Sequence, residues 1–294
     1  MEEMKTTNEF RNFDIVSEVS DHHFLKSSSG ESIMDNPNSE AHKRIMKEWE
    51  TLEQNLPESI YVRVYNNRID LMRAAIIGDT GTPYHDGLFF FDIALPSYYP
   101  HNPPKVHFIS FGNRIHSFLR PDGKVFLMLL NTHGTLWERW DPSFSTLPQV
   151  LLSLKALVHR EKLYDRSFEM YEHTCRLSLQ LLLSPPEHFE AFVNSHFRDR
   201  APVILSTLTD FVDGRCGNFG YASVTDKVSS PEILKWAEAF YPVMVEIFRL
   251  CGAPLDASFH RFWLTSLSWN GFNQSEIKKR GILKKVMKGI KSVF

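Results

Sequence analysis

The sequence predicts an α+β fold, with a helix followed by a meander of four short antiparallel strands and then by further helices. Three observations support this prediction. Apolar residues recur every three or four positions in residues 38–57, as they do on one face of a helix. From Ile60 onward the apolar pattern changes to a period close to two, which is typical of strands. Helical spacing returns after residue 145.

Residues 1–37 are rich in Ser, Glu, Asp and Asn and include the run KSSSGES at 26–32. They show no sustained hydrophobic period, and polar segments of this kind bury too little apolar surface to fold alone. We therefore expect a mostly disordered lead-in. Its first ten residues, MEEMKTTNEF, lack the basic start and apolar run of a secretory signal.

The first helix is expected within residues 38–57 and should end near Pro57. Asn38 or Ser39 is available as its N-cap, because either side chain can accept a hydrogen bond from a free amide of the first turn. Three apolar residues share one face of this helix: Ile45, Trp49 and Leu52.

Two strands are expected in IYVRVYNNRIDLMRAAIIG, residues 60–78. They join at Asn66 and Asn67, an amide pair that suits a hairpin turn. A third strand is expected in residues 86–96. The fourth, KVHFIS at 105–110, follows a bend in which three prolines cannot donate backbone hydrogen bonds. These prolines are Pro100, Pro103 and Pro104.

Helices are expected after the sheet. Residues 145–158 carry an apolar stripe composed of Leu147, Val150, Leu151, Leu154 and Leu157. Residues 185–197, PPEHFEAFVNSHF, start with two prolines and repeat aromatic residues at helical spacing. Two further helices are expected near 164–183 and 231–250. The small and polar residues of 213–232 indicate a linker.

The composition is typical of a soluble intracellular protein. Of 294 residues, 43% are hydrophobic and 23% are charged, and a net charge of −2 gives no general attraction to nucleic acid. Cys175, Cys216 and Cys251 form no CxxC pair, and the 13 histidines show no convincing ligand spacing. We therefore expect no metal, no cofactor and no nucleic-acid partner, and a location in the cytoplasm or nucleus.

Motifs between residues 40 and 200 occur in a characteristic order. GTPYHDGLFFFDIALPSYYPHNPPKVHF at 81–108 is followed by GKVF at 123–126 and by WERWDPSFSTLPQVLLSL at 137–154. In this order they resemble the third strand, the Tyr-Pro-x-x-Pro-Pro-Lys bend and the active-site loop of ubiquitin-conjugating enzymes. LLNTHG and PPEHFEAFVNSHFR resemble elements of the large members that combine carrier and ligase roles.

The resemblance implies a fold with one four-stranded antiparallel sheet and flanking helices. It also implies ubiquitin thioester transfer, in which a cysteine of the active-site loop accepts ubiquitin from an activating enzyme and delivers it to a lysine. The family pattern at this point is Gly-Lys-Val followed by that cysteine. Here Gly123, Lys124 and Val125 are followed by Phe126.

Phe126 has no nucleophilic atom, so no thioester can form on it. Two interpretations of its role remain open. Phe126 is either a plug that binds a partner or an aromatic side chain that fills the vacated position by packing.

A second departure from the family pattern precedes Phe126 by eight residues. The family usually carries His-Pro-Asn there, and the resemblance implies that this Asn holds the loop or donates to the oxyanion of the transfer step. The aligned residues here are His116, Ser117 and Phe118. Loss of one oxyanion donor typically lowers a rate by about 10² to 10³, and the nucleophile is missing as well, so we predict no catalytic residue.

The resemblance also implies two loops that receive ligases and the activating enzyme. His101 and Asn102 lie in the proline bend, where many members carry an aromatic and a basic residue, and Pro142 and Ser143 lie in WDPSFS. These four residues are the predicted partner-binding residues. The alternative is that both loops only close the fold.

Two features outside these loops suggest other functions. Cys216 lies beside Arg215 and among glycines, which can expose a thiol and lower its pKa, so an active carrier that uses this thiol is one alternative. The tail 277–294 has one apolar and one basic face if it is helical, with Lys284, Lys285, Lys288 and Lys291 as candidate anion-binding residues. It would lie on an anionic membrane, contact an acidic partner or pack back on its own domain.

The sequence thus predicts a lead-in at 1–37, a ubiquitin-conjugating-enzyme-like core domain at 38–200, a helical extension with a linker at 201–276 and a basic tail at 277–294. The predicted function is that of a catalytically defective variant in ubiquitin conjugation. It would bind ubiquitin, a ubiquitin ligase or an active conjugating enzyme. The alternatives are the Cys216 carrier and a membrane-surface scaffold targeted by the tail.

Overall fold

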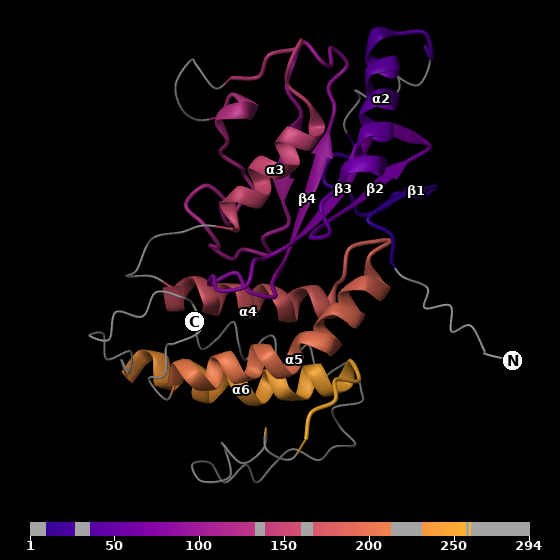
Figure 1. Cartoon of the computed structure of the whole chain (residues 1–294). Coiled ribbons are helices and arrows are strands. Elements are labelled where there is room, and N and C mark those ends of the chain that lie inside the picture. Colours follow the sequence, from indigo (N-terminus) through magenta and orange to yellow (C-terminus); the bar gives the residue numbers. More distant parts are fainter. Residues whose placement is uncertain are drawn as a thin grey trace, which may run out of the picture. The chain divides into compact units, whose positions relative to one another are not determined.

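The computed structural model in Figure 1 describes residues 10–26, 36–132, 139–159, 167–212, 231–256 and 259. A five-stranded sheet has the order β1-β2-β3-β4-β5. Its strands are β1 (Phe13–Val16), β2 (Ile60–Tyr65), β3 (Arg68–Ile77), β4 (Leu88–Ala94) and β5 (Lys105–Phe108). The α+β fold and the four-strand meander are confirmed, because β2 to β5 pair antiparallel in chain order. Asn66 and Asn67 form the predicted turn.

The structure adds an ordered segment at the N-terminus, where we expected a mostly disordered lead-in at residues 1–37. Strand β1 pairs in parallel with β2 and adds a fifth strand to the sheet. The Asn12 side chain fixes this pairing by donating to the carbonyls of Pro57 and Ile60, which lie 45 and 48 residues further along the chain. A strand of four residues is too short to show a hydrophobic period, and its partners are distant in sequence.

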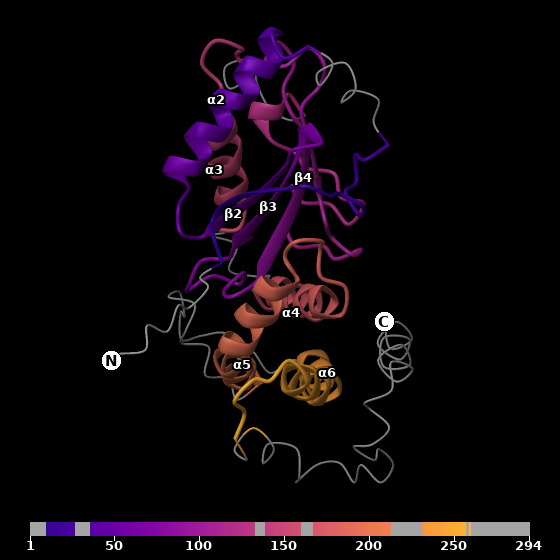
Figure 2. The same ribbon diagram turned by 90° about the vertical axis from the view of Figure 1, so that its right-hand side faces the viewer.

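We call residues 10–26 the N-terminal strap. They contribute the edge strand β1, and the residues after it lie on one side of the sheet (Figure 2). Helices α2 (Glu40–Asn55) and α3 (Leu147–Leu157) lie on the other side. Apolar strap residues pack against buried side chains of the sheet. The strap contributes Val16, Val19, Phe24 and Leu25, and the sheet contributes Tyr65, Leu71 and Ala94.

A row of polar residues crosses the face of the sheet beneath the strap. Arg63 pairs with Arg73, Arg73 with Asp92, and Asp92 with His107, so all four lie opposite one another in register. The interior of a sheet is an unusual place for charged side chains, which need partners when they are buried. The strap supplies one of these partners, because Asp21 lies 2.6 Å from the guanidinium of Arg73.

Each of the two helices that cover the opposite face begins at an N-cap residue whose side chain bonds a backbone amide of the first turn. Ser39 caps α2 by accepting a hydrogen bond from the amide of His42, which selects one of the two predicted caps. Thr146 and Gln149 form a capping box at the start of α3, where each side chain bonds the backbone amide of the other residue. The predicted stripe of α3 is buried at Leu147, Val150, Leu151 and Leu154.

Glu48 of α2 joins the proline bend to the start of α3. The Tyr99 hydroxyl donates to Glu48 Oε1 (3.0 Å), the Leu147 amide donates to Oε2 (3.1 Å), and the Arg44 guanidinium donates to Oε1 (3.0 Å). Glu48 is 3% exposed. One buried carboxylate therefore fixes two loops that lie far apart in sequence.

Helices also form at the other predicted places. They are α4 (Ser167–Leu183), α5 (Glu190–Val212) and α6 (Pro231–Leu250). Helix α5 begins at Glu190 and not at the prolines of 185–186, because His188 has a positive φ of 67° that no α-helix accommodates. It then continues through Pro202, past the predicted end of the core domain at residue 200.

The described residues form two compact units, with a boundary at Arg198 inside α5. In the second unit, helix α6 buries Phe240, Met244 and Phe248, and the ring of Phe240 stacks on Trp236 at 4.7 Å. Within the ranges that the structure describes, no helix has the length and apolar character needed to cross a membrane.

We predict that Glu48→Ala lowers the free energy of unfolding by about 2–4 kcal/mol, because buried donors of Tyr99 and Leu147 lose their acceptor. Glu50→Ala is the matched control, since it removes the same charge from an exposed position of α2. We expect the control to stay within about 0.5 kcal/mol of the parent. Urea unfolding of both variants measures the difference, and equal stabilities would contradict the role given to Glu48.

Candidate functional site

The candidate site lies in the loop that follows β5. After residue 108 the chain runs outward, turns at 120–123 and returns along its own outgoing limb. The amide of Phe108 donates to the Gly123 carbonyl (2.8 Å), and the amide of Phe126 donates to the Phe118 carbonyl (2.9 Å). The fold therefore places Phe118 and Phe126 side by side.

Gly123 is required at the turn for two reasons. Its φ of +82° lies in the left-handed region that favours glycine. In addition, a Cβ atom at this position would lie only 1.9 Å from the ring of His107. The turn thus packs against β5 so closely that only a residue without a side chain fits.

His116 holds the outgoing limb of the loop. Its ring is buried, and Nδ1 accepts a hydrogen bond from the amide of Phe118 at 3.0 Å. Nδ1 must be unprotonated to accept this bond. Burial lowers the pKa of His116 to about 4. The ring is therefore neutral at physiological pH and fixes the backbone at Ser117 and Phe118.

Phe126 is half-buried, and the Arg120 guanidinium lies 6.0 Å from the centre of its ring. The next residue, Leu127, donates its amide to the Thr132 hydroxyl (2.8 Å), which closes the following turn. Neither Phe118 nor Phe126 supplies a nucleophile or an oxyanion donor. The loop is well held, but at these two positions its side chains are aromatic and unreactive.

The thiols within the described residues do not lie in this loop. Cys175 of α4 is 1% exposed, and burial raises its pKa to about 12, so its thiol is neutral at physiological pH. Burial also raises the pKa of Cys251, which lies in the second unit. Cys216, the predicted alternative carrier, lies outside the described residues.

The two predicted partner-binding loops are joined to each other. The indole of Trp140 donates to the Pro100 carbonyl at 2.5 Å, and its ring lies 5.8 Å from the ring of Tyr99. Of the predicted residues, His101, Asn102 and Ser143 are exposed and Pro142 is half-buried. The proline bend and the WDPSFS segment therefore contact each other and stabilise each other's conformation.

These two loops expose two aromatic residues that we did not predict from the sequence. Tyr98 is 72% exposed and Phe144 is 77% exposed. The sequence could not distinguish Tyr98 from its buried neighbour Tyr99, because the bend has no regular period. Exposed aromatic side chains are common anchors of protein interfaces.

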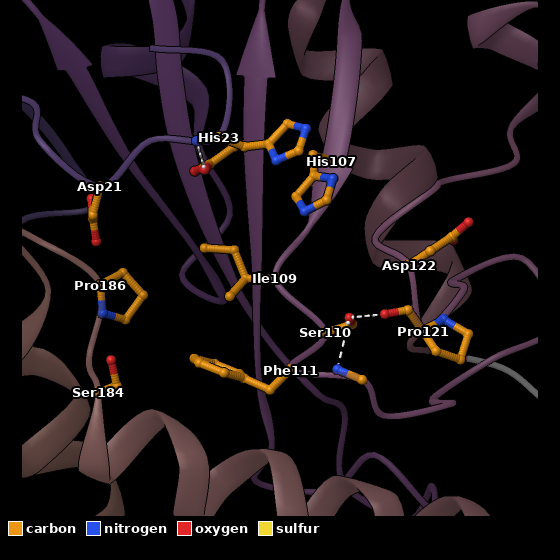
Figure 3. Close-up of a pocket in the computed structure, with 12 residues that line it drawn as sticks. Asp21, His23, His107, Ile109, Ser110, Phe111, Pro121, Asp122, Ser184 and Pro186 are labelled. Carbon is orange, nitrogen blue, oxygen red and sulfur yellow. Dashed lines mark hydrogen bonds between the residues drawn. The ribbon is translucent and has the colours of Figure 1, made fainter. Parts of the chain in front are cut away.

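A cavity of about 440 Å³ lies beside the turn, on the strap side of the sheet (Figure 3). The rings of His23 and His107 stack at its edge with centres 3.5 Å apart. The Ser110 hydroxyl donates to the Pro121 carbonyl at 2.6 Å. Its further lining residues are Asp21, Asp92, Ile109, Phe111, Gly112, Asp122, Ser184 and Pro186. The cavity combines five separate segments, so no local motif could predict it.

The basic tail at 277–294, with Lys284, Lys285, Lys288 and Lys291, lies outside the described residues. In the part of the chain that is described, no group of three or more His, Cys, Asp and Glu residues is arranged to hold a metal ion.

Comparison with known proteins finds a family model, described as ubiquitin-conjugating enzyme, that matches residues 44–173. The putative ubiquitin-conjugating enzyme E2 39 of Arabidopsis thaliana is 38% identical over 276 residues, which cover 86% of this chain and 87% of that protein. The probable ubiquitin-conjugating enzyme E2 24 of the same plant is 39% identical over 265 residues, which cover 83% of this chain and 29% of that protein. This chain thus spans less than a third of the length of that relative.

Among solved structures, that of human ubiquitin-conjugating enzyme E2 G1 aligns with a TM-score of 0.35 and 25% identity. The alignment covers 39% of this chain and 90% of that chain. The segment matched by the family model, 44–173, contains no cysteine, since the first cysteine of the chain is Cys175.

We predict that acid loosens the loop through His116. A free histidine titrates near 6.5 and the buried ring at about 4, so the folded loop binds fewer protons than the open one. The stability that His116 contributes is complete above pH 6.5 and is lost as the pH falls toward 4. The amide resonance of Phe118 reports it, and we expect this resonance to shift over that range.

His116→Asn is the matched control, because the Asn side-chain oxygen can accept the same bond without titrating. We expect the Phe118 resonance of this variant to stay constant between pH 7 and about 4.5. A resonance in the parent chain that is independent of pH would contradict the role of His116.

Proposed function

The chain belongs to the ubiquitin-conjugating enzyme family, and from this premise we propose that it is a binding or regulatory factor of ubiquitin conjugation that does not itself carry ubiquitin as a thioester. The observation that carries the proposal is the absence of any cysteine from residues 44–173, the segment that matches the family model. Thioester transfer requires a thiolate. A scaffold retained without that group is suited to binding.

The geometry of the loop supports the same proposal. Phe126, at the position that the resemblance assigns to the nucleophile, pairs through its backbone with Phe118. The loop around them keeps its turn at Gly123 and its buried His116. The proposal is therefore that the loop conformation was retained while its reactive side chain was replaced.

A ubiquitin ligase is the partner that best suits the exposed loops. Tyr98 and Phe144 offer large apolar surfaces beside the predicted residues His101 and Ser143. The buried carboxylate of Glu48 holds both loops, so little conformational entropy is lost when a partner binds. By occupying a ligase, the chain would compete with an active conjugating enzyme. Ubiquitin and an active conjugating enzyme are the other partners to be tested.

We predict that ligase domains of the ubiquitin pathway shift amide resonances around His101 and Pro142 when they are titrated into the labelled chain. Phe144→Ser should weaken such binding by about tenfold or more, because it removes an exposed aromatic anchor. Leu152→Ser is the matched control, since Leu152 is an exposed apolar residue of α3 outside both loops. Ubiquitin is titrated separately. An absence of shifts with every partner at high concentration would contradict the binding role.

A second prediction concerns the missing thiol. In the presence of activating enzyme, ubiquitin and ATP, Phe126→Cys should acquire a ubiquitin adduct that a thiol reductant removes. Val125→Cys is the matched control, because its side chain points into the core with 4% exposure. An adduct that forms equally on both variants, or on neither, would contradict the assignment of position 126.

A further inference from the structure

We propose that the part of the N-terminal strap that follows β1, residues 17–26, is a releasable cover of the sheet that is held closed by neutral histidines and opens when they become protonated. The inference does not depend on the proposed function. It rests on how the strap is attached, on the bonding of His22 and on the stacked rings of His23 and His107.

The strap is attached at its far end by a small set of polar contacts, which are partly exposed on the strap side. Asp21 lies 2.6 Å from the guanidinium of Arg73, and the backbone amide of His23 donates to Asp92 at 2.7 Å. Nearby, Ser20 bonds the carboxylate of Glu187. These contacts join the strap to β3, to β4 and to the segment before α5. A few specific bonds therefore determine whether this end of the strap is closed.

His22 fits its site only as the neutral imidazole. Its Nε2 lies 3.0 Å from the Met72 carbonyl, to which it can only donate, and Nδ1 accepts from the amide of Phe24 at 3.3 Å. A proton on Nδ1 would remove that acceptor and set two donors against each other. The side chain is fully buried, and burial lowers the pKa of His22.

The stacked rings of His23 and His107 are a second contact that protonation would disrupt. Their rings are parallel within 2° and their centres lie 3.5 Å apart. Figure 3 shows the two rings side by side at the edge of the cavity. Protons on both rings would place two cations in contact. Burial, and then the charge of His23, lower the pKa of His107 to about 4.

The charged groups around the rings of His22 and His107 do not reverse the lowering of their pKa values. Asp92 and Asp21 face His22 and favour its protonation, whereas the Arg73 guanidinium opposes it. Asp92 is already paired with Arg73 at 2.6 Å. His107 faces Asp92 and Asp122 as well as the two strap histidines, and Asp122 is paired with Lys124 at 3.0 Å. On the remaining side, His188 bonds the carbonyl of Glu18. For both rings burial outweighs the carboxylates.

The direction of the pH effect on strap closure follows from these pKa shifts. In the closed strap burial lowers the pKa of His107 from its ordinary value of 6.5 to about 4 and also lowers the pKa of His22, and opening of the strap uncovers both rings. The closed state binds fewer protons, so closure is strongest above pH 6.5 and weakens as the pH falls toward 4. His107 changes the closing equilibrium by at most about tenfold between pH 7.5 and 5.5, the limit reached when opening restores its ordinary pKa of 6.5, and His22 acts in the same direction.

Opening of the strap should also loosen the loop that carries Phe126. The ring of His107 occupies the space in which a side chain at Gly123 would lie, and the neighbouring Phe108 amide bonds the Gly123 carbonyl. Removal of His23 frees the outer face of that ring. The strap, β5 and the turn are thus parts of one packed unit.

Hydrogen exchange of the full chain tests the proposal. Protection of the amides in residues 17–26, corrected for the intrinsic rate, should fall up to about tenfold between pH 7.5 and 5.5, while amides of α3 keep theirs. His107→Phe keeps a stacked ring without a titrating group, and His22→Asn keeps an acceptor for the Phe24 amide. Each variant should reduce the pH dependence, and His42→Asn, on the opposite side of the sheet, should not.

Three outcomes would overturn the proposal. They are strap protection that does not depend on pH, an equal loss of protection in the strap and in α3, and a pH dependence that survives in both His107→Phe and His22→Asn. A loss confined to the strap and its contacts, and reduced in either variant, would support it.

Discussion

The buried ion pair between Arg73 and Asp92 is the constraint on which the arrangement of the sheet depends. Both side chains are almost fully inaccessible to solvent, and a buried charge is tolerated only when it is paired and hydrogen-bonded. Burial opposes the ionised carboxylate, but the Arg73 guanidinium outweighs it and lowers the pKa of Asp92. Neighbouring strands supply this pair, so β3 and β4 must remain in register. Asp21 and the His23 amide complete its bonding, which requires the strap to cover this face.

The same polar row connects the sheet to the candidate site. Asp92 lies opposite His107, whose ring packs against the turn at Gly123 and so fixes the limb that ends at Phe126. On the other side of the sheet, Glu48 holds the two loops that expose Tyr98 and Phe144. The fold of a ubiquitin-conjugating enzyme is thus stabilised around a loop without a thiol. This combination is the basis of our proposal that the chain binds partners and does not transfer ubiquitin.

Much of this fold could be predicted from the sequence, because its signals are local. The helix cap at Ser39, the turn at Asn66 and Asn67 and the apolar stripe of α3 all lie within short stretches. The strap could not be predicted. Its strand has only four residues, and Asp21 lies 52 residues from its partner Arg73. The sequence of this polar segment therefore shows no hydrophobic period. The cavity beside the turn depends on the same distant contacts.

The candidate site was only partly predictable for a similar reason. The motifs around Phe126 identified the loop, but the exposure of Tyr98 beside buried Tyr99 is decided by the bend and by the bond between Trp140 and Pro100. The role of His116 depends on the Nδ1 atom and on the burial of its ring, neither of which a sequence motif specifies.

The most direct test of the central claim is the intact mass of the unmodified chain after incubation with activating enzyme, ubiquitin and ATP without reductant. The account predicts the mass of the chain alone, while a conjugating enzyme with its cysteine in the same mixture gains the mass of one ubiquitin. A reductant-sensitive ubiquitin adduct on this chain would contradict it. Peptide mapping of such an adduct would show which of the three cysteines carries ubiquitin.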